Sequence, residues 1–136
     1  MPAGKFRIGL VQMRCTSDPR INMAAAERGI RRAAKRGARV VCLPELFRSL
    51  YFCQSEDHEQ FALAEPVPGP TTKALAALAR SLKVAIVGSV FERRAAGIYN
   101  NTAVVIDARL RAISRQRSIS ARPVMLRLCC RCPSNV

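Results

Sequence analysis

Four short apolar runs, rich in valine and isoleucine, restrict most strongly how this chain can fold. They span residues 6–13, 39–43, 84–91 and 101–107. Runs of this length predict β-strands, and their nearly continuous apolar character is typical of strands covered on both faces. Two helical segments lie between them, which gives the order β-α-β-loop-α-β-β. The sequence therefore predicts an α/β layered fold.

Both helices carry recognisable apolar faces and end signals. Asp18 can cap the free amides of the first helix, and Pro19 is tolerated in its first turn. This helix should run to about Arg36, with Gly37 as its C-terminal cap. The second helix is predicted over residues 71–83. Apolar residues recur every three or four positions, at Met23, Ala26, Ile30 and Ala33 in the first helix and at Leu75, Leu78 and Leu82 in the second.

The region between the second strand and the second helix lacks periodicity. Residues 47–70 include Pro66, Pro68 and Pro70. This composition predicts a long surface loop with a short helix at most. We also expect residues 93–97 to form a turn between the last two strands.

The chain changes character after Asp107. Residues 1–107 hold 16 Lys+Arg against 9 Asp+Glu, whereas residues 108–136 hold 7 arginines and no acidic residue. Half of the net charge of +14 therefore lies in the last 29 residues. We predict a partial domain over residues 1–107 and a basic Arg/Ser/Cys-rich tail over 108–136 that does not pack as a native element.

The basic tail suggests an alternative function, a non-catalytic module that binds nucleic acid or another polyanion. Seven arginines could make phosphate contacts that do not depend on base sequence. However, the tail has no aromatic residue on which a base could stack. The chain also lacks a signature of a nucleic-acid-binding module, so we do not expect nucleic acid as its partner.

The stretch RVVCLPELF presents a carboxylate at the end of a strand. Pro44 ends the apolar run, and Glu45 follows at the carboxyl end, where ligands bind in open α/β sheets. Leu43, Leu46 and Phe47 surround it with apolar side chains. A carboxylate removed from water accepts a proton more readily, which suits a general base. The alternative interpretation is a solvated glutamate in a turn.

Five motifs, in this order and spacing, resemble the nitrilase superfamily of carbon–nitrogen hydrolases. They are QM, CLPELF, AEPVPGPTT, IVGSVFER and YNNTAVVID, and they cover the chain from about Phe6 to Asp107. The segment PELFRSLYFCQSED is similar to the corresponding segment in the branch of the superfamily that hydrolyses N-carbamoyl amines in polyamine synthesis. The resemblance implies an α-β-β-α sandwich, of which this chain supplies an incomplete N-terminal portion.

The resemblance also implies a Glu-Lys-Cys triad, in which Glu45 matches the general base. In that mechanism the cysteine attacks the carbonyl carbon and the lysine stabilises the developing oxyanion. The substrate would be a small amide or carbamoyl amine, and no cofactor or metal would be needed. The complete family fold would form a homo-oligomer.

The other two members of the triad have no match. Lys83 is the last lysine, and SRQRSISARP stands where the family lysine is expected. Arg115 and Arg117 lie in that stretch, but arginine is a poor substitute for lysine. Cys129 and Cys130, in the cluster CCRC, come too early and lack the aspartate that follows the family cysteine. We therefore expect a truncated or frame-shifted relative that is inactive alone.

The remaining candidates carry weaker signals. Tyr51 and Phe52 could line a substrate entrance or simply pack the loop. His58 lies among acidic residues and fits a solvated loop position, and the CCRC cluster has no partner group for zinc. Asn100 and Asn101 are expected to shape the turn into the fourth strand.

Location and exposed surface can also be predicted. No signal peptide or apolar run of membrane-spanning length is visible, so we expect a cytoplasmic protein without a membrane contact. With only half of a sandwich, one face of the sheet should lose its covering layer. The residues expected on that face are Ile8, Leu10, Val84, Ile86, Val104 and Ile106.

Overall fold

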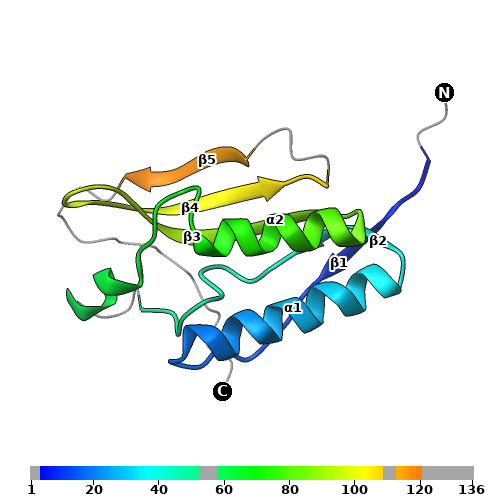
Figure 1. Cartoon of the computed structure of the whole chain (residues 1–136), viewed down its shortest axis with the longest axis horizontal. Helices are drawn as coiled ribbons and strands as arrows, with labels where there is room; N and C mark the ends of the chain where they lie inside the picture. The colour runs from blue at the N-terminus through cyan, green and yellow to red at the C-terminus, as the bar shows by residue number, and fades with distance from the viewer. Residues whose placement is uncertain (1–3, 53–57, 109–112, 121–136) are drawn as a thin grey trace, which may run out of the picture.

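The computed structural model of the chain describes residues 4–52, 58–108 and 113–120. These residues form a mixed α/β fold (Figure 1), as the sequence predicts. In chain order the elements are β1 (Arg7–Leu10), α1 (Pro19–Lys35), β2 (Ala38–Cys42), the 3-10 helix η1 (His58–Leu63), α2 (Pro70–Leu82), β3 (Ala85–Ala95), β4 (Ile98–Ile106) and β5 (Ile113–Ser120).

The strands form one sheet in the order β1-β2-β3-β4-β5. The pairs β1–β2 and β2–β3 are parallel, and the pairs β3–β4 and β4–β5 are antiparallel. Each parallel pair is joined by a connection that contains a helix, as parallel strands require. Both helices cover the same face of the sheet (Figure 1). We call the other face, away from α1 and α2, the open face.

The structure confirms the residues predicted to cap the two ends of α1. The Asp18 side chain accepts a hydrogen bond from the backbone N–H of Arg20 at 2.8 Å and so caps the first turn of α1. Gly37, just beyond α1, has a φ of 85°, which favours glycine. The 3-10 helix η1 is the short helix expected within the long loop.

The core lies between the helices and the sheet. Its largest members include Ile30 of α1, Leu75 of α2 and Ile86 of β3, all fully buried. The helix α1 approaches β1 closely at Gly9. A Cβ atom added there would lie 2.7 Å from the Cβ atom of Ala33, which is too close for a side chain. A larger residue at position 9 would push α1 away from the sheet.

The first strand is shorter and more exposed than predicted. The buried strand expected over residues 6–13 is wrong, because β1 covers four residues and lies at the edge of the sheet. Ile8 is 57% exposed and Leu10 is 79% exposed. Side chains alternate along a strand, so Gly9 faces α1 while Ile8 and Leu10 lie on the open face.

Six residues were predicted to lie on the uncovered face of the sheet, and only Ile8 and Leu10 do so. Val84, Ile86, Val104 and Ile106 are buried in the core, so the prediction for them is wrong. Their apolar character marked them as buried but did not show on which side. Val105 alternates with its buried neighbours and is 41% exposed on the open face.

Part of the basic tail forms a strand, contrary to the expectation that the tail does not pack. The backbone of β5 pairs antiparallel with β4 from Ile106↔Ile113 to Asn100↔Ser120. An edge strand pairs through backbone groups and tolerates polar side chains, which explains why the apolar pattern gave no signal. Residues 121–136 lie outside the described residues. The division of the chain at residue 107 stays a prediction.

Candidate active site

Glu45 lies just beyond the carboxyl end of β2. The backbone N–H of Val11 donates to the Cys42 carbonyl at 2.9 Å, and that of Leu43 donates to the Val87 carbonyl at 2.9 Å. These bonds continue the parallel pairing of β1, β2 and β3 up to the residue before Pro44. Glu45 is therefore presented at the edge of the sheet where parallel strands end, as the sequence predicts.

The turn that follows Glu45 has a strained backbone and several anchors. Leu46 has a φ of 47°, a left-handed conformation that is costly for a residue with a side chain. Its N–H donates to the Ser89 hydroxyl of β3 at 2.7 Å, and its carbonyl accepts from the Ser49 N–H at 3.1 Å. The next side chain, Phe47, is completely buried. Core packing and hydrogen bonds together hold this conformation.

The start of α1 holds the same turn from the other side. Asn22 is fully buried, and its Nδ2 atom donates to the carbonyls of Arg48 at 2.9 Å and Thr16 at 2.7 Å. Its Oδ1 atom accepts from the Thr16 N–H at 2.7 Å. A buried amide with its hydrogen bonds made fixes the segments it joins.

The Glu45 carboxylate points to β4. The Nδ2 atom of Asn101 donates to its Oε1 atom at 2.5 Å. The Glu45 side chain is exposed, so the expectation that its apolar neighbours remove it from water is wrong in this chain. Leu46 and Phe47 turn into the core instead and leave the carboxylate outside.

An aromatic cluster adjoins Asn101. Phe91 of β3 is the register partner of Asn101 in β4, so both side chains lie on the same face of the sheet. The ring centroid of Phe91 lies 4.9 Å from that of Phe52, 6.0 Å from that of Phe61 and 5.7 Å from that of Tyr99. Phe52 therefore belongs to this cluster, whereas Tyr51 is 36% exposed. A substrate entrance at Tyr51 and Phe52 stays a prediction.

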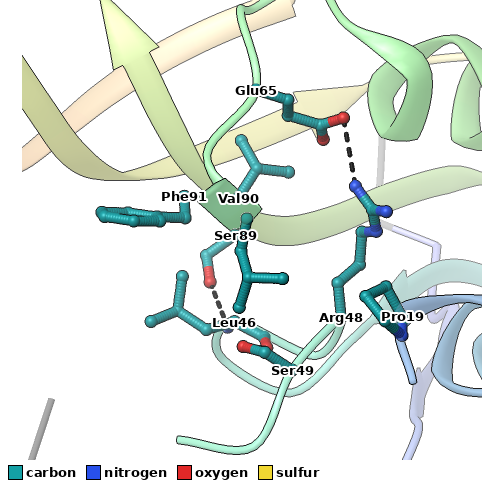
Figure 2. A pocket seen from close by; sticks show the side chains of 9 residues that line it. Pro19, Leu46, Arg48, Ser49, Glu65, Ser89, Val90 and Phe91 are labelled. Atoms are coloured by element: carbon teal, nitrogen blue, oxygen red, sulfur yellow. Dashed lines mark hydrogen bonds and ion pairs between the residues drawn. The ribbon is translucent and has the colours of Figure 1, made fainter. Parts of the chain in front are cut away.

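A small cavity lies behind the turn (Figure 2). Its volume is about 20 Å³, which is room for a water molecule and not for a substrate. Arg48 reaches across it to Glu65, with Nη1 and Oε2 3.2 Å apart. Glu65 Oε2 also accepts from the Thr71 N–H at 3.2 Å, while its buried Oε1 atom has no protein partner. The Arg48–Glu65 ion pair across this cavity supports the turn. The exposed Glu45 carboxylate does not line the cavity.

Cys15, one of the two free cysteines in the described part of the chain, is a poor candidate for the nucleophile. Burial raises the pKa of the Cys15 thiol, whose Sγ atom lies 3.4 Å from the Phe47 carbonyl oxygen. A thiol with a raised pKa is poorly nucleophilic at neutral pH. Cys129 and Cys130 lie outside the described residues. Arg115 and Arg117 lie in β5, where only the backbone is described.

Within the part of the chain that the structure describes, no group of three His, Cys, Asp or Glu residues could hold a metal ion. In the same residues, no helix is long and apolar enough to cross a membrane.

Comparison with known proteins identifies the family. Residues 7–126 match the carbon-nitrogen hydrolase family, and the chain belongs to it. The chain is 39% identical over 99 residues to N-carbamoylputrescine amidase of Solanum lycopersicum, covering 72% of this chain and 33% of that protein. It is 35% identical over 120 residues to the chloroplastic omega-amidase of Arabidopsis thaliana, covering 85% of this chain and 32% of that protein. The chain thus spans about a third of the length of these relatives.

Solved structures agree with this assignment. A carbon-nitrogen hydrolase from Helicobacter pylori superimposes with a TM-score of 0.76 at 30% identity, over 84% of this chain and 39% of that chain. Nit3 of Saccharomyces cerevisiae, a member of the nitrilase superfamily, gives a TM-score of 0.69 at 26% identity, over 84% of this chain and 44% of that chain. These matches confirm the resemblance to the nitrilase superfamily and the incomplete nitrilase-type fold.

Two polar residues of this site escaped sequence analysis. Ser89 lies within an apolar strand, and Asn101 was expected to shape a turn. Asn101 instead lies inside β4, and its side chain contacts Glu45. Their polarity could have marked them in the sequence, because Ser89 lies within one predicted apolar strand and Asn101 begins the next.

Proposed function

We propose that this chain supplies the general base, Glu45, of a carbon–nitrogen hydrolase that acts on N-carbamoyl amines such as N-carbamoylputrescine. The observation that carries the proposal is the Glu45 carboxylate, exposed at the carboxyl end of the parallel strands and bonded to Asn101. The substrate class rests on the similarity to N-carbamoylputrescine amidase of Solanum lycopersicum.

The chemistry needs a proton acceptor on a fixed support. Glu45 would take the proton of a cysteine thiol, and the resulting thiolate would attack the carbamoyl carbon. A lysine ammonium would stabilise the oxyanion until ammonia, protonated by the acid form of Glu45, leaves. Water would then release the carbamate from the thiol, and the carbamate would decompose to the amine and carbon dioxide.

The lysine and the cysteine of this mechanism have no match within these 136 residues. The chain spans only about a third of the length of its relatives, and the proposal assigns to these residues the general base alone. These 136 residues alone should therefore bring about no turnover.

Two other functions are less well supported. The omega-amidase relative indicates that an ω-amide is a second substrate class open to the same chemistry. Polyanion binding by the basic tail rests on its seven arginines alone, and the backbone pairing of residues 113–120 with β4 adds nothing to it.

The test is complementation with a relative. The chain would be co-expressed with the part of tomato N-carbamoylputrescine amidase that follows its matched segment, and ammonia release from N-carbamoylputrescine would be measured. We expect activity only when both parts are present, and its loss in Glu45→Gln. The matched control Glu59→Gln, at an exposed glutamate in η1, should keep activity. Equal activity of Glu45→Gln and Glu59→Gln would show that Glu45 is not the base.

A further inference from the structure

We infer that Asn101 is a positioning residue for the general base: its side-chain amide fixes the Glu45 carboxylate in the orientation that accepts the proton. The inference rests on the proposed function of Glu45. It begins from the contact between Asn101 Nδ2 and Glu45 Oε1, which joins residues 56 positions apart in the chain.

Asn101 has a rigid support. It lies within β4, where its register partners are Phe91 on β3 and Ser118 on β5. A strand paired on both sides cannot shift without breaking two ladders, so the sheet fixes the Cα position of Asn101 and the face from which its side chain extends. Glu45, by contrast, lies in a turn and is exposed. The contact therefore transfers the rigidity of the sheet to a side chain that would otherwise move freely.

The chemistry of the amide suits this role. An ionised carboxylate can only accept hydrogen bonds, so the amide nitrogen and not the amide oxygen must face it. The amide does not ionise, and it therefore never competes with Glu45 for the proton. Within the described part of the chain, Glu45 Oε2 takes part in no hydrogen bond. That oxygen remains available to a thiol.

A second anchor acts on the backbone of the same turn. The Ser89 hydroxyl of β3 accepts from the N–H of Leu46, the residue that follows Glu45. Adjacent antiparallel strands thus hold the turn at two points, the backbone through Ser89 and the carboxylate through Asn101. Two points define both the position and the direction of the Glu45 side chain, and base catalysis depends on both.

The neighbouring asparagine provides a matched control. Asn100 is in the same strand, and adjacent side chains point to opposite faces, so Asn100 lies on the face away from Glu45. If Asn101 only stabilised β4, replacing either asparagine would affect the protein similarly. If Asn101 positions Glu45, only its replacement should affect proton transfer.

The kinetic test uses the full chain complemented as described above. Asn101→Ala removes the donor without adding a charge beside Glu45. It should lower kcat by about 10- to 100-fold, since a misplaced general base loses much of its effect, and leave KM within about twofold. Asn100→Ala should change neither constant by more than about twofold. An active complex in which Asn101→Ala keeps its kcat would overturn the inference while leaving the proposed function intact.

A second measurement needs no activity. Magic-angle-spinning NMR of the sedimented, 13C,15N-labelled full chain detects through-space transfer between the side-chain nitrogen of Asn101 and the carboxyl carbon of Glu45, even in an associated protein. We expect this cross-peak in the wild type and in Asn100→Ala, and its loss in Asn101→Ala and Glu45→Ala. Its absence from the wild type would overturn the inference. A cross-peak together with a complemented complex that lacks activity would support the contact and refute the proposed function instead.

Discussion

Arg48 and Glu65 form an ion pair, with Nη1 and Oε2 3.2 Å apart, that joins the Glu45 turn to the loop before α2. Glu65 is 7% exposed, and its backbone is also bonded to β3: its N–H donates to the Phe91 carbonyl at 3.0 Å, and its carbonyl accepts from the Arg93 N–H at 2.8 Å. A buried carboxylate needs partners that replace the water it has lost. Arg48 is the charged partner among these contacts.

Replacing Arg48 by alanine should destabilise the chain by roughly 1–3 kcal/mol, because it leaves the buried Glu65 carboxylate without its charged partner. Urea unfolding at a fixed protein concentration, followed by circular dichroism, measures the change. The control Arg31→Ala removes an exposed arginine of α1 and should shift the midpoint little. Equal midpoints for the two variants would contradict the role given to this ion pair.

The fold followed from local signals wherever those signals were strong. Asp18 with Pro19 predicted the start of α1, and Gly37 marked its end, because capping chemistry depends on a few adjacent residues. The side of the sheet was harder to predict. Ile8 and Ile86 look alike in sequence, yet one is exposed at an edge strand and the other is buried beneath the helices.

The candidate site shows the same division. Glu45 could be predicted, because a proline-ended strand followed by a carboxylate is a local pattern. Its contact with Asn101 could not, because it depends on the register of β3 with β4 and on the path of a turn 56 residues earlier. The exposure of Glu45 also depends on tertiary packing, since Leu46 and Phe47 turn inward beside it.

The open face should make the isolated chain associate. Ile8, Leu10 and Val105 expose apolar surface there, and exposed apolar patches favour association. Size-exclusion chromatography should show species larger than a monomer. Val105→Lys should shift elution towards the monomer, whereas Val104→Lys, its neighbour on the buried side, should unfold the chain. A monodisperse wild-type monomer with a steep cooperative urea transition would contradict this expectation.

The cap of α1 should make stability depend on pH. Hydrogen bonds from the Arg20 side chain and the Arg20 backbone N–H lower the pKa of Asp18 in the folded chain. The ionised form therefore stabilises the fold above the unfolded-state pKa, about 3.9, and this contribution is lost as the pH falls through the folded pKa. Asp18→Asn keeps a cap but does not titrate.

Urea midpoints of the wild type and Asp18→Asn, compared at pH 6 and at pH 3, measure this effect. The amount by which the urea midpoint of the wild type exceeds that of Asp18→Asn should be smaller at pH 3 than at pH 6. A difference in midpoint that stays constant or grows at pH 3 would show that the Asp18 carboxylate makes no such pH-dependent contribution to stability.

The central claim is that these 136 residues supply the general base of a carbon–nitrogen hydrolase and neither its lysine nor its nucleophile. Ammonia release from N-carbamoylputrescine by the purified chain alone tests it most directly. We predict no release above buffer, and no change in Glu45→Gln or Cys130→Ala. Turnover by the chain alone that is lost in both variants would contradict the claim, because it would place a working base and nucleophile within this chain.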